Sequence, residues 1–94
     1  MKIKLLPQAR ADIRLAVDFV RKEDPRAADN LIVAVQKSLR LIENNPNVGR
    51  FDPEDGTREW SIPNWPYLIP YRVKANEIEV LHLWHTRRNK PGSW

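Results

Sequence analysis

The stretch RKEDPRAA, residues 21–28, decides how the first half of the chain folds. Asp24 can accept hydrogen bonds from the free amides at the start of a helix, and Pro25 suits the first helical turn. A helix therefore begins here directly after another one, because apolar residues recur every three or four positions on both sides. We expect two amphipathic helices, one at about residues 8–23 and a second stopped by Asn-Asn-Pro at 44–46, joined as an antiparallel hairpin.

Outside this hairpin, the sequence is typical of strands and turns. Residues 2–6 alternate charged and apolar side chains, as a half-buried strand does, and residues 47–57 have the Gly, Pro and Asp content of a loop. Pro70 lies in a later strand-like stretch, where its missing amide hydrogen indicates an edge position or a bulge. Aromatic and β-branched residues predict three strands, at 58–62, 67–74 and 77–85, with a tight turn at Ala75-Asn76.

The order β-α-α-β-β-β predicts one α+β domain over residues 1–94, with the helix hairpin packed on one face of a small, mostly antiparallel sheet. The chain has no cysteine for disulfides and no Cys/His cluster for a structural metal, so its stability must come from packing. Its N-terminus is too short an apolar stretch for a signal peptide, and no segment is long enough to span a membrane. We expect a cytoplasmic protein with no membrane partner.

Positive charge gathers at the C-terminal end. The chain has 16 basic and 12 acidic residues, and no carboxylate side chain follows Glu79. If the last strand is continuous, Leu83, His85 and Arg87 share one face, so that the strand is buried in its middle and emerges at the rim of a cleft. We expect this end to carry uncompensated positive charge, which suits a polyanion or an acidic protein partner.

The candidate chemistry is that of a metal-independent ribonuclease. The sequence has no glycine-rich phosphate loop, and His82 and His85 lie three apart on opposite faces of a strand, so we expect neither a cofactor nor a metal site. His85 could act as base or acid, with Arg87 and Arg72 stabilising the charge of the transition state. RNA phosphates and bases, or a target protein, could be bound by Arg50, Arg58, Tyr67, Arg88, Lys90 and Trp94. The same basic end could instead be a docking patch for an acidic protein segment, with no catalysis.

Several motifs together resemble a known family. They are LPQARADIRLAVDFV, PRAADNL, NPNVGR, TREWSIPNWPYLIPYRV and IEVLHLWHTRR, which between them cover nearly the whole chain. In combination they resemble the RelE/ParE superfamily of toxins from bacterial type II toxin–antitoxin modules. Members of that superfamily share the order β-α-α-β-β-β.

The resemblance implies a growth-arresting toxin that is neutralised by a cognate antitoxin, whose C-terminal segment wraps the toxin. RelE-like members cleave mRNA on the ribosome, and ParE-like members poison DNA gyrase. Only Arg87 matches a catalytic arginine of the RelE pattern, because this chain has Leu68 where that pattern has another arginine and Ser93 or Trp94 where it has a late tyrosine. Three functions stay open: a ribosome-dependent endoribonuclease, a gyrase poison, and a non-toxic family member that only binds antitoxin.

Overall fold

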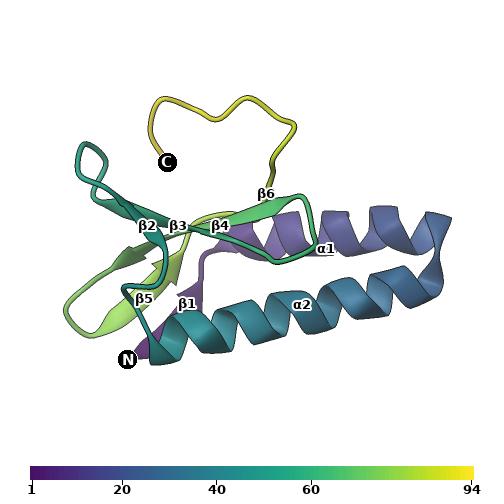
Figure 1. The fold of residues 1–94 in the computed structure, drawn as a ribbon, viewed down its shortest axis with the longest axis horizontal. Helices are drawn as coiled ribbons and strands as arrows, with labels where there is room; N and C mark the ends of the chain where they lie inside the picture. The colour runs from purple at the N-terminus through teal and green to yellow at the C-terminus, as the bar shows by residue number, and fades with distance from the viewer.

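Two helices form one layer of the molecule and a six-stranded sheet forms the other (Figure 1). A computed structural model describes residues 1–94. The elements in chain order are β1 (Lys2–Leu5), α1 (Pro7–Glu23), α2 (Pro25–Asn44), β2 (Arg50–Asp52), β3 (Thr57–Ser61), β4 (Tyr67–Val73), β5 (Glu77–Val80) and β6 (Trp84–His85). Neither helix is long and apolar enough to cross a membrane.

The helix hairpin forms as the sequence predicts. Only Asp24 separates α1 from α2, and its Oδ1 accepts hydrogen bonds from the amides of Arg26 at 3.0 Å and Ala27 at 3.3 Å. These two bonds satisfy amides that have no partner inside the helix. The predicted α+β class, with the hairpin against the sheet, is confirmed.

The sheet is mixed, in the order β1-β5-β4-β3-β2. β1 pairs with β5 in parallel, and every other pairing is antiparallel. β4 is the central strand, because β3 pairs along one of its edges and β5 and β6 pair along the other.

Two predicted boundaries were wrong. The expected loop at 47–57 contains the short strand β2. This strand has only three residues, which are too few to show a strand pattern in the sequence. The expected strand at 77–85 is divided into β5 and β6, and the intervening residues 81–83 leave the ladder. We expected Leu83, His85 and Arg87 to share one face of a continuous strand. Side chains alternate between the two faces only within β5 and within β6, so this expectation does not hold across residues 83–87.

Pro70 explains where this division falls. It lies in the central strand rather than at an edge, and its carbonyl accepts a hydrogen bond of 2.9 Å from the amide of Leu81. The amide and carbonyl of one strand residue face the same neighbour, so the missing hydrogen of Pro70 faces the gap between β5 and β6. The sequence predicted the irregularity but not which strand carries it.

The core lies between the helices and the inner face of the sheet, by which we mean the face toward α2. Tyr67, Ile69 and Tyr71 of β4 contribute to this core, and Trp60 of β3 reaches α2 by donating a hydrogen bond of 3.1 Å to Ser38 Oγ. Because side chains alternate along a strand, Leu68, Pro70 and Arg72 belong to the opposite, outer face. The other large core residues are Leu31, Ile42, Ile78 and Val80.

Candidate functional site

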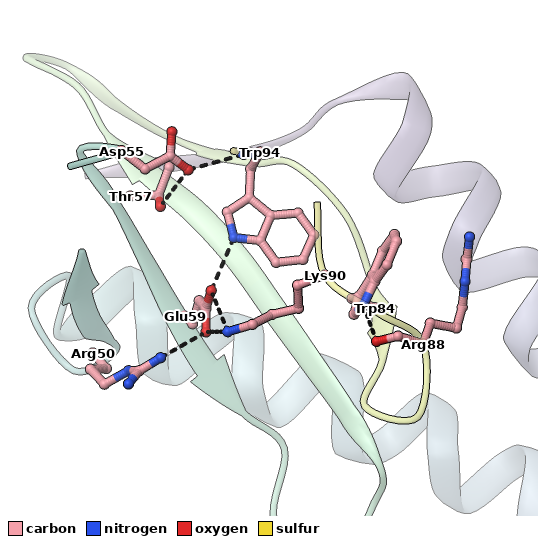
Figure 2. Close-up of polar contacts among 8 residues, drawn as sticks. All are labelled: Arg50, Asp55, Thr57, Glu59, Trp84, Arg88, Lys90 and Trp94. Carbon is pink, nitrogen blue, oxygen red and sulfur yellow. Dashed lines mark hydrogen bonds and ion pairs between the residues drawn. The ribbon is translucent and has the colours of Figure 1, made fainter. Parts of the chain in front are cut away.

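The basic end of the chain forms a strap over the sheet. After β6, residues 86–94, here called the C-terminal strap, turn back across the outer face toward β2 and β3 (Figure 1). The last residue is held at two points: the amide of Trp94 donates to Asp55 Oδ2 at 3.0 Å, and its indole Nε1 donates to Glu59 Oε2 at 3.0 Å (Figure 2). The chain end is therefore anchored to β3 and to the turn before it.

Glu59 partly neutralises the basic end. Lys90 Nζ lies 3.1 Å from Glu59 Oε1, and Arg50 Nη2 lies 3.4 Å from the same oxygen (Figure 2). Burial alone would raise the pKa of Glu59, but hydrogen bonds from Trp94, Lys90 and Arg50, with the Lys90 charge, outweigh it and hold the pKa below its usual 4.5. The expectation of uncompensated charge was wrong for Lys90, because the compensating acid comes from a strand 31 positions earlier.

An aromatic cluster of His82, Trp84 and Trp94 packs together where the strap crosses the sheet. The rings of Trp84 and Trp94 meet edge to face with centroids 5.2 Å apart, and His82 lies 5.5 Å from Trp94. Arg88 places its guanidinium 4.2 Å from the centre of the Trp84 ring, while its carbonyl accepts a hydrogen bond of 3.3 Å from the Trp84 indole (Figure 2). Arg88 is thus held at both its side chain and its backbone, although it is exposed.

The His85 ring accepts a hydrogen bond from the backbone that follows it. Its Nδ1 lies 3.1 Å from the backbone amide of Arg87, which donates to it. A ring nitrogen that accepts a hydrogen bond carries no hydrogen, so the proton of the neutral ring sits on Nε2. The ring also meets Tyr67 edge to face at 5.2 Å. The Arg87 side chain is exposed and forms no ion pair.

The structure does not bring Arg72 to His85. His85 is the neighbour of Tyr67 across the β4–β6 pair, and both belong to the inner face. Arg72 is five residues further along β4, roughly 16 Å away at the usual rise of a strand, and belongs to the outer face. Its neighbour across the sheet is Glu79 of β5. The proposed catalytic set stays a prediction, with its members on two faces.

The remaining predicted binding residues are also dispersed. Arg58 donates to the carbonyls of Asn47 and Gly49 at 3.2 and 2.9 Å, so its guanidinium holds the chain before β2. Tyr67 is only 7 % exposed. Three residues of this binding set, Arg88, Lys90 and Trp94, lie in the strap together with the predicted catalytic residue Arg87. Arg50 lies near the strap on the other side of Glu59.

A groove runs between α1 and the start of the strap, and sequence reasoning missed it. It has a volume of about 860 Å³, and its lining includes Leu15 and Phe19, which are 68 % and 67 % exposed. These two residues fall outside the apolar stripe of α1, which was the available signal. Basic residues from both sides join them, namely Arg21, Lys22, His85 and Arg88, and the acids Asp12 and Asp18 of α1 also line the groove.

Asp12 fixes the floor of this groove. Its Oδ2 accepts a hydrogen bond of 3.1 Å from the amide of Leu83 and lies 3.1 Å from His82 Nδ1. One carboxylate of α1 thereby holds the segment between β5 and β6, which has lost its ladder partners. No three His, Asp or Glu side chains lie close enough together to hold a metal ion.

Comparison with known proteins adds three findings. A family model described as the ParE toxin of the type II toxin–antitoxin system parDE matches residues 3–90. "Putative toxin Y4kP" from Sinorhizobium fredii (strain NBRC 101917 / NGR234) is 29 % identical over 73 residues, which cover 78 % of this chain and 75 % of that protein. A solved structure of the chromosomal ParDE system from P. aeruginosa shares the fold with a TM-score of 0.80, at 24 % identity over 93 % of this chain and 97 % of that one.

The matched residues include both helices, every strand except the first residue of β1, and the strap as far as Lys90. Such systems pair a toxin with an antitoxin, so a cognate antitoxin is the partner of this chain. The chain belongs to the ParE toxin family and is the toxin component of a type II toxin–antitoxin system.

Proposed function

We propose that this toxin arrests growth by binding DNA gyrase through its basic C-terminal end, and not by cleaving ribosome-bound mRNA. The observation that carries this proposal is the state of His85, whose Nδ1 already accepts the amide of Arg87. Membership of the ParE family supports the same target.

Metal-independent RNA cleavage needs a base near the 2′-hydroxyl, an acid near the leaving oxygen and a cation near the phosphorus. His85 cannot accept a proton at Nδ1 without losing its bond to Arg87, and its Nε2 carries a hydrogen in the neutral ring. Arg72, the second cation of the predicted set, belongs to the other face of the sheet. In this arrangement His85 has no free ring nitrogen to act as the base, whereas binding an acidic protein surface needs only the charge of the basic end.

Two assays on the purified toxin separate the targets. We expect inhibition of gyrase supercoiling, with gyrase-dependent DNA breaks, and no new ends in primer extension on a translated message. Cleaved transcripts together with unimpaired gyrase would overturn the proposal. Activity in neither assay, with antitoxin binding retained, would support the non-toxic family member.

The groove beside α1 supports a proposal for the antitoxin as well. Exposed Leu15 and Phe19 offer an apolar wall. In the lining, the cations Arg21, Lys22 and Arg88 outnumber the acids Asp12 and Asp18. An amphipathic, acidic antitoxin segment that wraps the toxin fits this pattern, and it would cover Arg88 at the same time.

The groove can be tested without disturbing the core. Leu15→Ser with Phe19→Ser removes only exposed side chains, so we expect a folded and toxic protein that its antitoxin binds at least tenfold more weakly. Val33→Ser, which changes a 46 % exposed residue of α2, is the matched control and should bind normally. Equal antitoxin affinity for the double variant and the control would place the antitoxin elsewhere.

A further inference from the structure

The outer face of the sheet has one acidic centre on which the strap depends. Glu59 receives Lys90 at 3.1 and 3.3 Å, the Trp94 indole at 3.0 Å and Arg50 at 3.4 Å, and its side chain is only 11 % exposed. Two of these three partners belong to the strap (Figure 2). A carboxylate with this many donors is a strong and directional anchor.

The strap has little else to hold it. Its backbone forms two hydrogen bonds near β6, from Thr86 to Pro66 and from Arg88 to His85, and residues 89–94 form none with other backbone groups. Residues 86–93 are exposed. The far half of the strap is therefore fixed by side-chain contacts, which Glu59 and Asp55 provide.

A chain of contacts leads from Glu59 to the exposed basic residues. Glu59 binds the Trp94 indole, the Trp94 ring packs against Trp84 at 5.2 Å, and Trp84 carries the guanidinium of Arg88 at 4.2 Å. Trp84 also donates to the Arg88 carbonyl. Freeing Trp94 would remove one side of the packing that holds Trp84 in place, and with it the position of Arg88.

We propose that Glu59 is a positioning residue for toxicity: by latching Trp94 and Lys90 to β3, it holds the strap in the one arrangement in which Arg87 and Arg88 meet the target. Glu59 is itself covered and does not touch the target. Holding the segment in advance lowers the ordering cost at binding, so the latch acts on affinity. The inference rests on the basic end being the working surface, and it does not depend on which target that surface meets.

The test uses the full chain and measures the attachment of the strap separately from toxicity. Glu59→Ala removes the anchor, and Glu59→Gln keeps an oxygen for the Trp94 indole but no charge for Lys90. Glu79→Ala is the matched control, since Glu79 is a half-buried acid on the same face that pairs with Lys74 at 3.5 Å and has no contact with the strap. The indole resonance of Trp94 is identified by its absence from a Trp94→Phe variant.

We expect Glu59→Ala to speed hydrogen exchange at the Trp94 indole at least tenfold. The toxin dose needed to arrest growth should rise at least tenfold, while the far-ultraviolet circular dichroism spectrum stays as in the parent. Glu59→Gln should recover part of both effects, and Glu79→Ala should show neither. A merely structural role would lower toxicity only in step with the melting temperature.

Two results would overturn the latch. One is unchanged indole exchange in Glu59→Ala, which would mean that Glu59 does not hold the strap. The other is full toxicity with a freed strap, which would mean that the arrangement of the strap is irrelevant. Failure of the gyrase proposal is recognised differently, by growth arrest in the parent without any effect on supercoiling.

Discussion

At the scale of single residues, Tyr71 determines how the chain leaves α2 and enters the sheet. Its hydroxyl donates to the carbonyl of Pro46 at 2.7 Å and accepts from the amide of Gly49 at 2.9 Å, and the residue is fully buried. A Cβ at Gly49 would lie 2.8 Å from the Tyr71 ring and hydroxyl, so only glycine fits beside it. Burial raises the pKa of Tyr71 above its usual 10.0, partly offset by the Gly49 hydrogen bond and the charge of Arg58.

Tyr71→Phe should therefore destabilise the fold by about 1–3 kcal/mol, because it leaves a buried amide and a carbonyl without their shared partner. The measurement is the free energy of unfolding in urea. Tyr67→Phe is the control, since its hydroxyl forms no protein hydrogen bond, and it should change stability by less than about 0.5 kcal/mol. Equal losses in the two variants would contradict the role given to the Tyr71 hydroxyl.

Arg87 is a residue whose loss should affect toxicity and not folding. Its side chain is exposed and has no carboxylate partner. The hydrogen bond to His85 comes from the backbone amide of Arg87, so a change of side chain keeps it. Arg87→Ala should lower the free energy of unfolding by less than about 0.5 kcal/mol and weaken target binding roughly tenfold, which corresponds to about 1.4 kcal/mol. Arg40→Ala, at an exposed position of α2, is the control; a fully toxic Arg87→Ala would move the working surface elsewhere.

At the scale of elements, the start of α2 rests on one side chain. Asp24 caps two amides of α2, whereas α1 begins at Leu6 with no side-chain cap. Asp24 also ends α1, because its own amide donates to the carbonyl of Val20 at 2.8 Å and closes the last turn of that helix. A single residue thus serves both ends of the connection.

Asp24→Ala should cost about 0.5–2 kcal/mol of unfolding free energy, which a thermal or urea melt would measure. Asp29→Ala removes a similar carboxylate in the next turn, whose ion pair with Arg21 is exposed at 3.5 Å, and it should cost less than about 1 kcal/mol. If the two variants lose the same unfolding free energy, the hydrogen bonds of the Asp24 cap contribute nothing to stability beyond the charge of the carboxylate.

The elements also show what local pattern can and cannot predict. The hairpin was predictable because Asp24-Pro25 and the apolar stripes act over a few residues. The gap between β5 and β6 depends on Pro70 meeting Leu81 across the sheet, and the two are 11 positions apart in the sequence. No periodicity within either strand contains that information.

The candidate site was predictable to a similar degree. The basic residues of the strap are adjacent in sequence, so their clustering could be predicted, but Glu59 reaches Lys90 only through the return of the chain over the outer face. His85 was identified by residue type and position, whereas its tautomer depends on a backbone bend at Arg87. Long-range pairing and local backbone geometry are the two kinds of fact that the order of residues alone does not display.

At the scale of the whole molecule, the two faces of the sheet have different chemistry. The inner face carries the apolar core against the helices, and the outer face carries ion pairs and the strap. The charged groups that face Glu59 are Lys90 from the strap and Arg50 from β2, with Asp55 holding the other end of Trp94. The strap is therefore attached through two carboxyl groups, and the ion pair with Lys90 depends on the ionised state of Glu59.

This dependence predicts how stability changes with acid. The folded pKa of Glu59 lies below its usual 4.5, so its ionisation stabilises the fold above about pH 4.5, and this contribution is lost as the pH falls through the lowered value. Urea melts between pH 7 and pH 3 should therefore show a smaller decline for Glu59→Gln than for the parent. Parallel declines in the two proteins would show that Glu59 is not coupled to folding.

The parallel pairing of β1 with β5 has a consequence for the moment at which the toxin becomes dangerous. Ile3 pairs with Ile78, 75 positions later, so the first segment to be synthesised must wait for one of the last. At about 5–20 residues per second, translation delays that contact by roughly 4–15 s. A nascent chain in this interval has no completed sheet and no strap, and prematurely terminated fragments share that state. We therefore expect unfinished copies to lack the basic end through which we propose that the toxin acts.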